Sequence, residues 1–154
     1  MRAGCLVLLL VIASVAEAQD ILVTTTADEF GETPSACSLR EAIEAANRGG
    51  DFGGCAWPGP APTIRLGAET YVLTREGARE DSNATGDLDV RVPLRVEGSD
   101  FNVTVLTVSV TDRVLHVHDA NVELAHLRIQ RTAALLMGTA LPSPTASTAE
   151  ASSR

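Results

Sequence analysis

Short apolar and β-branched segments recur along this chain and predict β-strands. The first covers residues 21–26 (Ile-Leu-Val-Thr-Thr-Thr). After residue 62 the segments become shorter and closer together, and Gly, Asp, Asn or Pro separates each from the next. They cover residues 63–66, 71–74, 88–90, 94–97, 103–110, 114–117, 122–124 and 127–129. Such a pattern is typical of a mostly β protein with many short strands.

The spacing of these segments is compatible with two architectures. Residues 94–96 and 115–117 have similar sequences and begin 21 positions apart, an interval that suits one coil of a solenoid. A β-sandwich would also give short strands with frequent turns. Periodicity alone leaves both open.

One helix is predicted between the first strand and the others. Ser38 can cap it, and Glu41, three residues later, can reach back to complete a capping box. Asn47 and Gly49 supply a stop signal. A helix this short depends on packing for its stability. Its apolar face consists of Leu39, Ala42, Ile43 and Ala46.

The two ends of the chain differ from its middle. Residues 1–18 have the features of a secretory signal peptide: Arg2, an apolar run and the Ala16-Glu17-Ala18 cleavage pattern. The mature chain is therefore predicted to begin at Gln19, without a membrane span. Residues 132–154 are rich in Ala, Ser, Thr and Pro and are predicted to be a disordered tail. One domain, residues 19–131, lies between them.

Cysteine content and charge narrow the class of protein. Cys37 and Cys55 are the only cysteines after the signal peptide, so an exported protein is expected to join them in a disulfide. A metal site would need more ligands than two cysteines provide. The net charge is −8, which argues against nucleic acid and against an anionic membrane surface as partners.

The segment Cys37-Ser38-Leu39-Arg40-Glu41-Ala42 matches the motif of the bacterial CSLREA domain, and residues 23–29 and 86–90 resemble its flanks. The resemblance covers about residues 21–131. It implies a short right-handed parallel β-helix, as in secreted or surface proteins, with the helix as an N-terminal cap on the first coil. The family brings no catalytic residues to transfer. Its members usually continue through many more coils, whereas here the Ala/Ser/Thr/Pro-rich segment follows residue 131.

An acidic loop offers the best set of ligand-like side chains. Calcium prefers several oxygen ligands on a tightly turned loop. The EF-hand pattern fails, because Val92 stands where its bidentate Glu would be. The competing interpretation is a turn in which Asp and Asn side chains bond their own backbone, and we prefer it. The candidate calcium ligands are Asp81, Asn83, Thr85, Asp87 and Asp89.

Three histidines are candidate zinc ligands. His116 and His118 are two residues apart on a predicted strand and so share a face, and His126 could approach from the next coil. However, Leu115 and Val117 would then occupy the buried face. We therefore expect the histidines to point to solvent and to be unrelated.

The sequence as a whole predicts an exported, non-enzymatic β-helix module. Its role would be structural or adhesive, at the cell surface or in the medium, with an unknown surface or glycan partner. The candidate cofactor is calcium, at the acidic loop. The alternative is a carbohydrate-active lyase- or hydrolase-like fragment, or a glycan-binding one, with Asp87 and Asp89 as carboxylates or Trp57 as a sugar-stacking platform. Aspartates this close together are more often turn formers.

Overall fold

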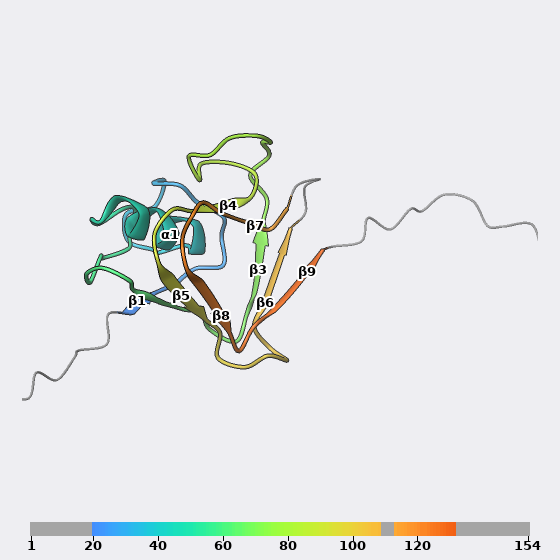
Figure 1. The fold of residues 1–154 in the computed structure, drawn as a ribbon. Helices are drawn as coiled ribbons and strands as arrows, with labels where there is room; N and C mark the ends of the chain where they lie inside the picture. Colours follow the sequence, from blue (N-terminus) through green and yellow to red (C-terminus); the bar gives the residue numbers. More distant parts are fainter. Residues whose placement is uncertain (1–19, 109–112, 132–154) are drawn as a thin grey trace, which may run out of the picture.

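The computed structural model describes residues 20–108 and 113–131. The predicted signal peptide and tail lie outside these residues, as do residues 109–112, which include the end of the predicted strand 103–110. The described part is mostly β, with one helix (Figure 1). In chain order its elements are β1 (Asp20–Leu22), α1 (Leu39–Arg48), β2 (Thr63–Arg65), β3 (Thr70–Leu73), β4 (Leu88–Val90), β5 (Leu94–Glu97), β6 (Val105–Val108), β7 (Leu115–Val117), β8 (Val122–Ala125) and β9 (Arg128–Arg131).

The strands form three parallel sheets, with the orders β1-β2-β5-β8, β3-β6-β9 and β4-β7. In chain order, β2, β3 and β4 belong to three different sheets. The next three strands then pair with them in the same order: β5 with β2, β6 with β3 and β7 with β4. In Figure 1, β5 lies beside β8, and β3, β6 and β9 run side by side. Parallel pairing between all named strands excludes the antiparallel sandwich.

The expected 21-residue repeat is wrong. Residues 94–96 belong to β5 and residues 115–117 to β7, and these strands lie in different sheets. The strands that do pair are separated by unequal intervals: 32 residues between Arg65 and Glu97, 28 between Arg95 and Glu123, and 27 between Asp89 and His116. Loops of different length cause this inequality, so no single period is visible in the sequence.

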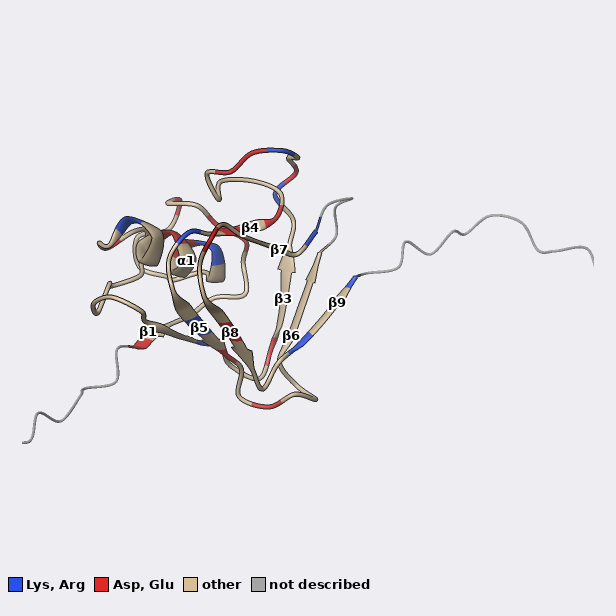
Figure 2. Cartoon of the chain, viewed as in Figure 1, with Lys and Arg blue, Asp and Glu red and all other residues tan. Residues whose placement is uncertain are grey.

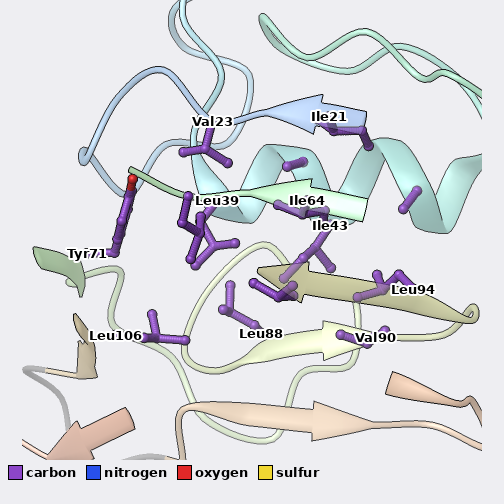
Figure 3. Packing of buried hydrophobic residues seen from close by; sticks show 14 of the residues in the cluster. Ile21, Val23, Leu39, Ile43, Ile64, Tyr71, Leu88, Val90, Leu94 and Leu106 are labelled. Atoms are coloured by element: carbon purple, nitrogen blue, oxygen red, sulfur yellow. The ribbon is translucent and has the colours of Figure 1, made fainter. Parts of the chain in front are cut away.

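Apolar side chains form ladders inside the stack. Ile21 pairs in register with Ile64, and Ile64 with Val96. All three are buried, because every second residue of a strand points to the same side. Figure 3 shows such residues from the strands and the helix directed toward one another. The labelled members are Ile21, Val23, Leu39, Ile43, Ile64, Tyr71, Leu88, Val90, Leu94 and Leu106.

Helix α1 packs on the first strands, with most of its contacts to β4 and some to β2. Its predicted apolar face is fully buried: Leu39, Ala42, Ile43 and Ala46 are all at most 4% exposed. The helix ends at Gly49, which adopts a left-handed conformation (φ 63°) that glycine tolerates better than other residues. Among the described residues, no helix combines the length and the apolar character that a membrane crossing requires.

Candidate functional site

Strand β4 lies between β7 on one side and the α1 region on the other. Toward β7, the Leu88 amide donates to the Val114 carbonyl (3.1 Å), and the Val90 carbonyl accepts from the His118 amide (2.8 Å). The backbone groups of Asp89, between them, point the other way. A bare strand edge of this kind would expose unpaired amides and carbonyls and invite pairing with another chain.

Arg40, in the first turn of α1, satisfies part of this edge. Its guanidinium donates hydrogen bonds to the backbone carbonyls of Gly86 (2.8 Å), Asp87 (3.0 Å) and Asn83 (3.3 Å). It also forms an ion pair with Asp28, with 2.6 Å between Nε and Oδ1. The side chains of Arg40 and Asp28 are 0% and 1% exposed. The five donors of a guanidinium make arginine suited to collecting several oxygens at once.

Asp28 extends this network to β3. Its Oδ2 accepts from the backbone amides of Thr74 (2.7 Å) and Arg75 (2.9 Å), directly after β3 ends. The Arg40–Asp28 pair therefore satisfies backbone groups next to two of the first strands.

Asn47, near the end of α1, covers the rest of the β4 edge. Its Nδ2 donates to the Asp89 carbonyl and its Oδ1 accepts from the Arg91 amide, both at 2.8 Å. The Asp89 amide donates to Oδ1 of Asn83 (3.1 Å), and Asn83 Nδ2 donates to the Arg40 carbonyl (2.9 Å). Arg40 and Asn47 are seven residues apart and share a helix face. Their side chains, with Asn83, stand where a neighbouring strand would be.

The helix is fixed by its own cap and by the cysteines. The Ser38 side chain accepts from the Glu41 amide (3.2 Å), and Glu41 Oε2 accepts from the Ser38 amide (3.0 Å), which forms a capping box. The other oxygen of Glu41 accepts from the Gly31 amide (2.7 Å). The Cys37 and Cys55 sulfur atoms are 1.94 Å apart, at disulfide-bonding distance. These contacts hold the segment before the helix and the loop after it against the helix start.

The acidic loop before β4 contains the predicted calcium ligands, and its charged residues are visible above β4 in Figure 2. Two of the five are used otherwise. The side chain of Asn83 bonds to backbone groups of Asp89 and Arg40, and Asp87 forms an ion pair with Arg113 (2.5 Å). These contacts match the structural-turn interpretation. Calcium binding by the set stays a prediction.

The Thr85 part of the loop is organised by Glu80. The Thr85 amide donates to Glu80 Oε1 (2.8 Å), and the Ser82 amide donates to Glu80 Oε2 (3.0 Å). Burial alone would raise the pKa of Glu80, but these hydrogen bonds, together with the Ser82 hydroxyl, favour the carboxylate and lower the pKa overall. The loop is thus a self-bonded structure that lies over β4.

Asp81 and Asp89, the other two aspartates of the set, meet the histidines of β7. Asp89 Oδ1 lies 2.9 Å from His118 Nε2 and 3.2 Å from His116 Nδ1. Asp81 Oδ1 lies 3.9 Å and 3.7 Å from the same two nitrogens. One ligand-type atom from each residue lies within 4.8 Å of the other three. Two imidazoles and two carboxylates are ligands that divalent transition ions accept.

The expectation that the histidines are unrelated and point to solvent is wrong for two of them. His116 and His118 are 30% and 27% exposed, and both contact the fully buried Asp89. Asp89 and His116 are register partners in the β4–β7 pair, which is why one carboxylate reaches both rings. His126 does not join them, because its Nδ1 lies 3.2 Å from Glu97. The sequence gives no register, so it could not reveal the Asp–His contact.

Glu97 belongs to an ionic ladder on the outer side of the β1-β2-β5-β8 sheet. It contacts Arg65 (2.5 Å) and Arg95 (3.2 Å), while Arg65 also contacts Asp20 (3.1 Å) and Arg95 also pairs with Glu123. The hydrogen bond from Arg95 is the main reason why the pKa of Glu97 is below its ordinary value. Exposed pairs of this kind stabilise little individually.

Trp57, considered as a sugar platform, borders a surface hollow of about 310 Å³ at the end of α1. Its backbone amide donates to Asp51 (2.8 Å), and its ring lies close to Gly49. Asn47, Pro60 and other residues complete the hollow. Sugar binding by Trp57 stays a prediction.

The opposite end of the stack carries exposed apolar residues. Strands β7, β8 and β9 are each the last strand of their sheet, and each presents a large apolar side chain that is 39–42% exposed. These side chains continue ladders that are buried elsewhere: Val117 follows Val90, Leu124 follows Ile64 and Val96, and Ile129 follows Tyr71 and Leu106. We call Val117, Leu124 and Ile129 the open end.

Comparison of the chain with protein-family models, with curated proteins and with solved structures gives no match.

Proposed function

We propose that this protein is an exported, non-enzymatic structural module: the capped start of a right-handed parallel β-helix of the CSLREA type. In this proposal, the module acts at the cell surface or in the medium, where its open end joins further coils or an adhesion partner. The observation that carries the proposal is the replacement of a neighbouring strand along β4 by side chains of α1 and of the loop before β4.

The difference between the two ends supports a role in starting a stack. At the α1 end, Arg40, Asn47 and Asn83 satisfy the β4 edge. At the open end, Leu124 and Ile129 are exposed, although their register partners on the preceding strands are buried. An apolar surface in register with a core suits more strands of the same kind or the strand edge of a partner.

The contacts of the two candidate carboxylates support a non-enzymatic role. Asp87 is 1% exposed and paired with Arg113, and Asp89 is 0% exposed and contacts both histidines. A general acid or nucleophile for glycoside cleavage must reach its substrate. Buried carboxylates whose oxygens already contact Arg113 or the histidines are suited to stabilising the fold.

The experiment follows the protein in the organism that makes it. Cells would be fractionated with an antibody to the protein, and their adhesion to a defined surface would be measured for wild type, a deletion strain and two variants. The Leu124→Arg/Ile129→Arg double variant places charge at the open end. Leu22→Arg is the matched control, because Leu22 is 64% exposed on β1, outside the open end.

We expect the protein in the medium or at the surface, and we expect the deletion and the double variant to lose adhesion while Leu22→Arg keeps it. Retention in the cytoplasm would overturn the proposal. So would turnover of a polysaccharide by the purified protein that Asp87→Asn abolishes, since this would identify an enzyme.

A further inference from the structure

We infer that Asp89, His116 and His118, with Asp81 as the fourth ligand, bind a divalent transition ion of the zinc type. This inference does not depend on the proposed structural role. It rests on side chains from three segments that converge on one point: Asp89 from β4, the histidines from β7 and the residue after it, and Asp81 from the acidic loop.

The spacing of the ligand atoms fits such an ion. Nitrogen and oxygen ligands lie about 2.0–2.1 Å from zinc in a tetrahedral site, so two ligands are separated by about 3.3 Å. The distances from Asp89 Oδ1 to the two ring nitrogens, 2.9 and 3.2 Å, are close to this value. The distances from Asp81 Oδ1 are 3.7 and 3.9 Å, and a small movement of this exposed side chain would shorten them.

The ligand types select the class of ion. Calcium and magnesium take oxygen ligands and do not favour imidazole. Two imidazoles with two carboxylates suit zinc and its neighbours in the first transition row. The acidic loop that the sequence analysis considered for calcium thus contributes two ligands, Asp81 and Asp89. With the two histidines, the set favours zinc over calcium.

The site is built on a fixed frame. Asp89 and His116 are register partners, and the His118 amide is bonded to the Val90 carbonyl. Asp89 Oδ2, the oxygen that faces away from the histidines, accepts from the Asn83 amide (3.2 Å), which orients the carboxylate. Partners of this second layer commonly fix the direction of a metal ligand. Asp81 is 69% exposed, so an ion can enter from solvent on its side.

The charges near the site also favour a cation. Asp81, Asp87 and Asp89 bring three carboxylates, and Arg113 and Arg91 bring two guanidinium groups. Arg113 Nη2 lies 3.1 Å from His116 Nδ1. The same nitrogen lies 3.2 Å from Asp89 Oδ1, so it faces both a donor and an acceptor. A bound ion would replace the contact with Arg113, and Arg113 would keep its ion pair with Asp87.

The test titrates the full chain, oxidised, stripped of metal and prepared without a histidine tag. Zinc binding would be measured by isothermal titration calorimetry, and cobalt would serve as an absorption probe of coordination geometry. His118→Gln removes one ligand from a partly exposed position and should leave the fold intact. His126→Gln is the matched control, because its ring contacts Glu97 outside the site.

We expect one zinc ion per chain, a rise in Tm with zinc but not with calcium, and the absorption of four-coordinate cobalt. His118→Gln should weaken zinc binding by at least about tenfold, as the loss of groups at metal sites generally does, and His126→Gln should not. Equal affinity in wild type and His118→Gln would overturn the inference. A Tm rise with calcium alone would also overturn it and would favour the oxygen-ligand interpretation of the acidic loop.

Discussion

Replacing Arg40 by methionine tests whether the contacts of α1 with the β4 edge hold the fold together. Methionine has a similar length and is compatible with a helix, but it donates no hydrogen bond. The variant would leave Asp28 buried without its ion-pair partner and three backbone carbonyls without their donor. The helix itself would keep its capping box and its disulfide.

The expected loss can be estimated from the burial of the pair. Removing one partner of a buried ion pair costs about 3–5 kcal/mol, because the other charge stays buried. The amides of Thr74 and Arg75 still compensate Asp28 in part, which places the value at the lower end of this range. The carbonyls of Asn83, Gly86 and Asp87 add to the loss, since a buried acceptor without a donor costs about 1–3 kcal/mol. We therefore expect a loss of about 4 kcal/mol, a large part of the 5–15 kcal/mol typical of a domain.

Urea unfolding of the oxidised protein, followed by far-UV circular dichroism, measures this loss. With a denaturant slope of about 2 kcal/mol/M, the midpoint should fall by about 2 M. Arg48→Met is the matched control, because Arg48 lies on the same helix but its side chain is 50% exposed and contacts Glu44 and the rings of Phe52 and Phe30. It should lose less than about 1 kcal/mol for each of these contacts. If Arg40→Met loses no more stability than Arg48→Met, the contacts of Arg40 with the β4 edge do not hold the fold together.

Two further perturbations test other parts of the module. A Cys37→Ser/Cys55→Ser double variant should lose about 3 kcal/mol in urea unfolding, because a cross-link over 18 residues restricts the unfolded chain, and reducing the wild type should have the same effect. The pKa of Glu97 is lowered in the folded protein, so its stabilising contribution is complete above its ordinary value of 4.5 and is lost as the pH falls through the lower folded value. The Tm difference between wild type and Glu97→Gln should thus be present above pH 4.5 and should shrink as the pH falls below it.

The predictions for the cysteines and for Glu97 can each be refuted by one result. A reduced wild type that unfolds at the same urea concentration as the oxidised protein would contradict the role of the cysteines. A Tm difference at Glu97 that persists unchanged to pH 3 would show that the effect does not come from its charge.

Local signals in the sequence were sufficient for the helix and for several strands, whereas the strand predicted at residues 21–26 ends at Leu22. The capping box at Ser38 and Glu41 and the stop at Gly49 involve neighbours within a few residues, and the helix Leu39–Arg48 begins and ends accordingly. Strands β4 and β5 have the predicted bounds, because alternation of apolar residues needs no long-range information. The general class, mostly β with short strands, follows from the same signal.

Long-range contacts were beyond the reach of the sequence. Arg40 bonds to residues 43–47 positions away, and Asn47 bonds to residues 42 and 44 positions away. Nothing in the local pattern distinguishes these polar side chains from exposed ones on a helix. The meeting of Asp89 with His116 depends on the register of β4 on β7, which unequal loops conceal. The sequence contains one relevant signal: Arg40 and Asn47 are seven residues apart and therefore place two polar side chains on the same face of the helix.

The backbone groups along the β4 edge already have hydrogen-bond partners, whereas the open end is exposed. The two ends of the molecule therefore differ in how they can take part in assembly. In a head-to-tail contact, β7 of one copy would meet the β4 edge of the next, where Arg40, Asn47 and Asn83 already bond the backbone, so we expect copies that associate through the open end to meet head to head. A two-fold contact of this kind is closed after one pairing and brings the last strands together in antiparallel orientation. Head-to-tail growth into a filament would require a free edge at both ends. The side chains of Arg40, Asn47 and Asn83 would therefore oppose head-to-tail pairing at the β4-β7 sheet.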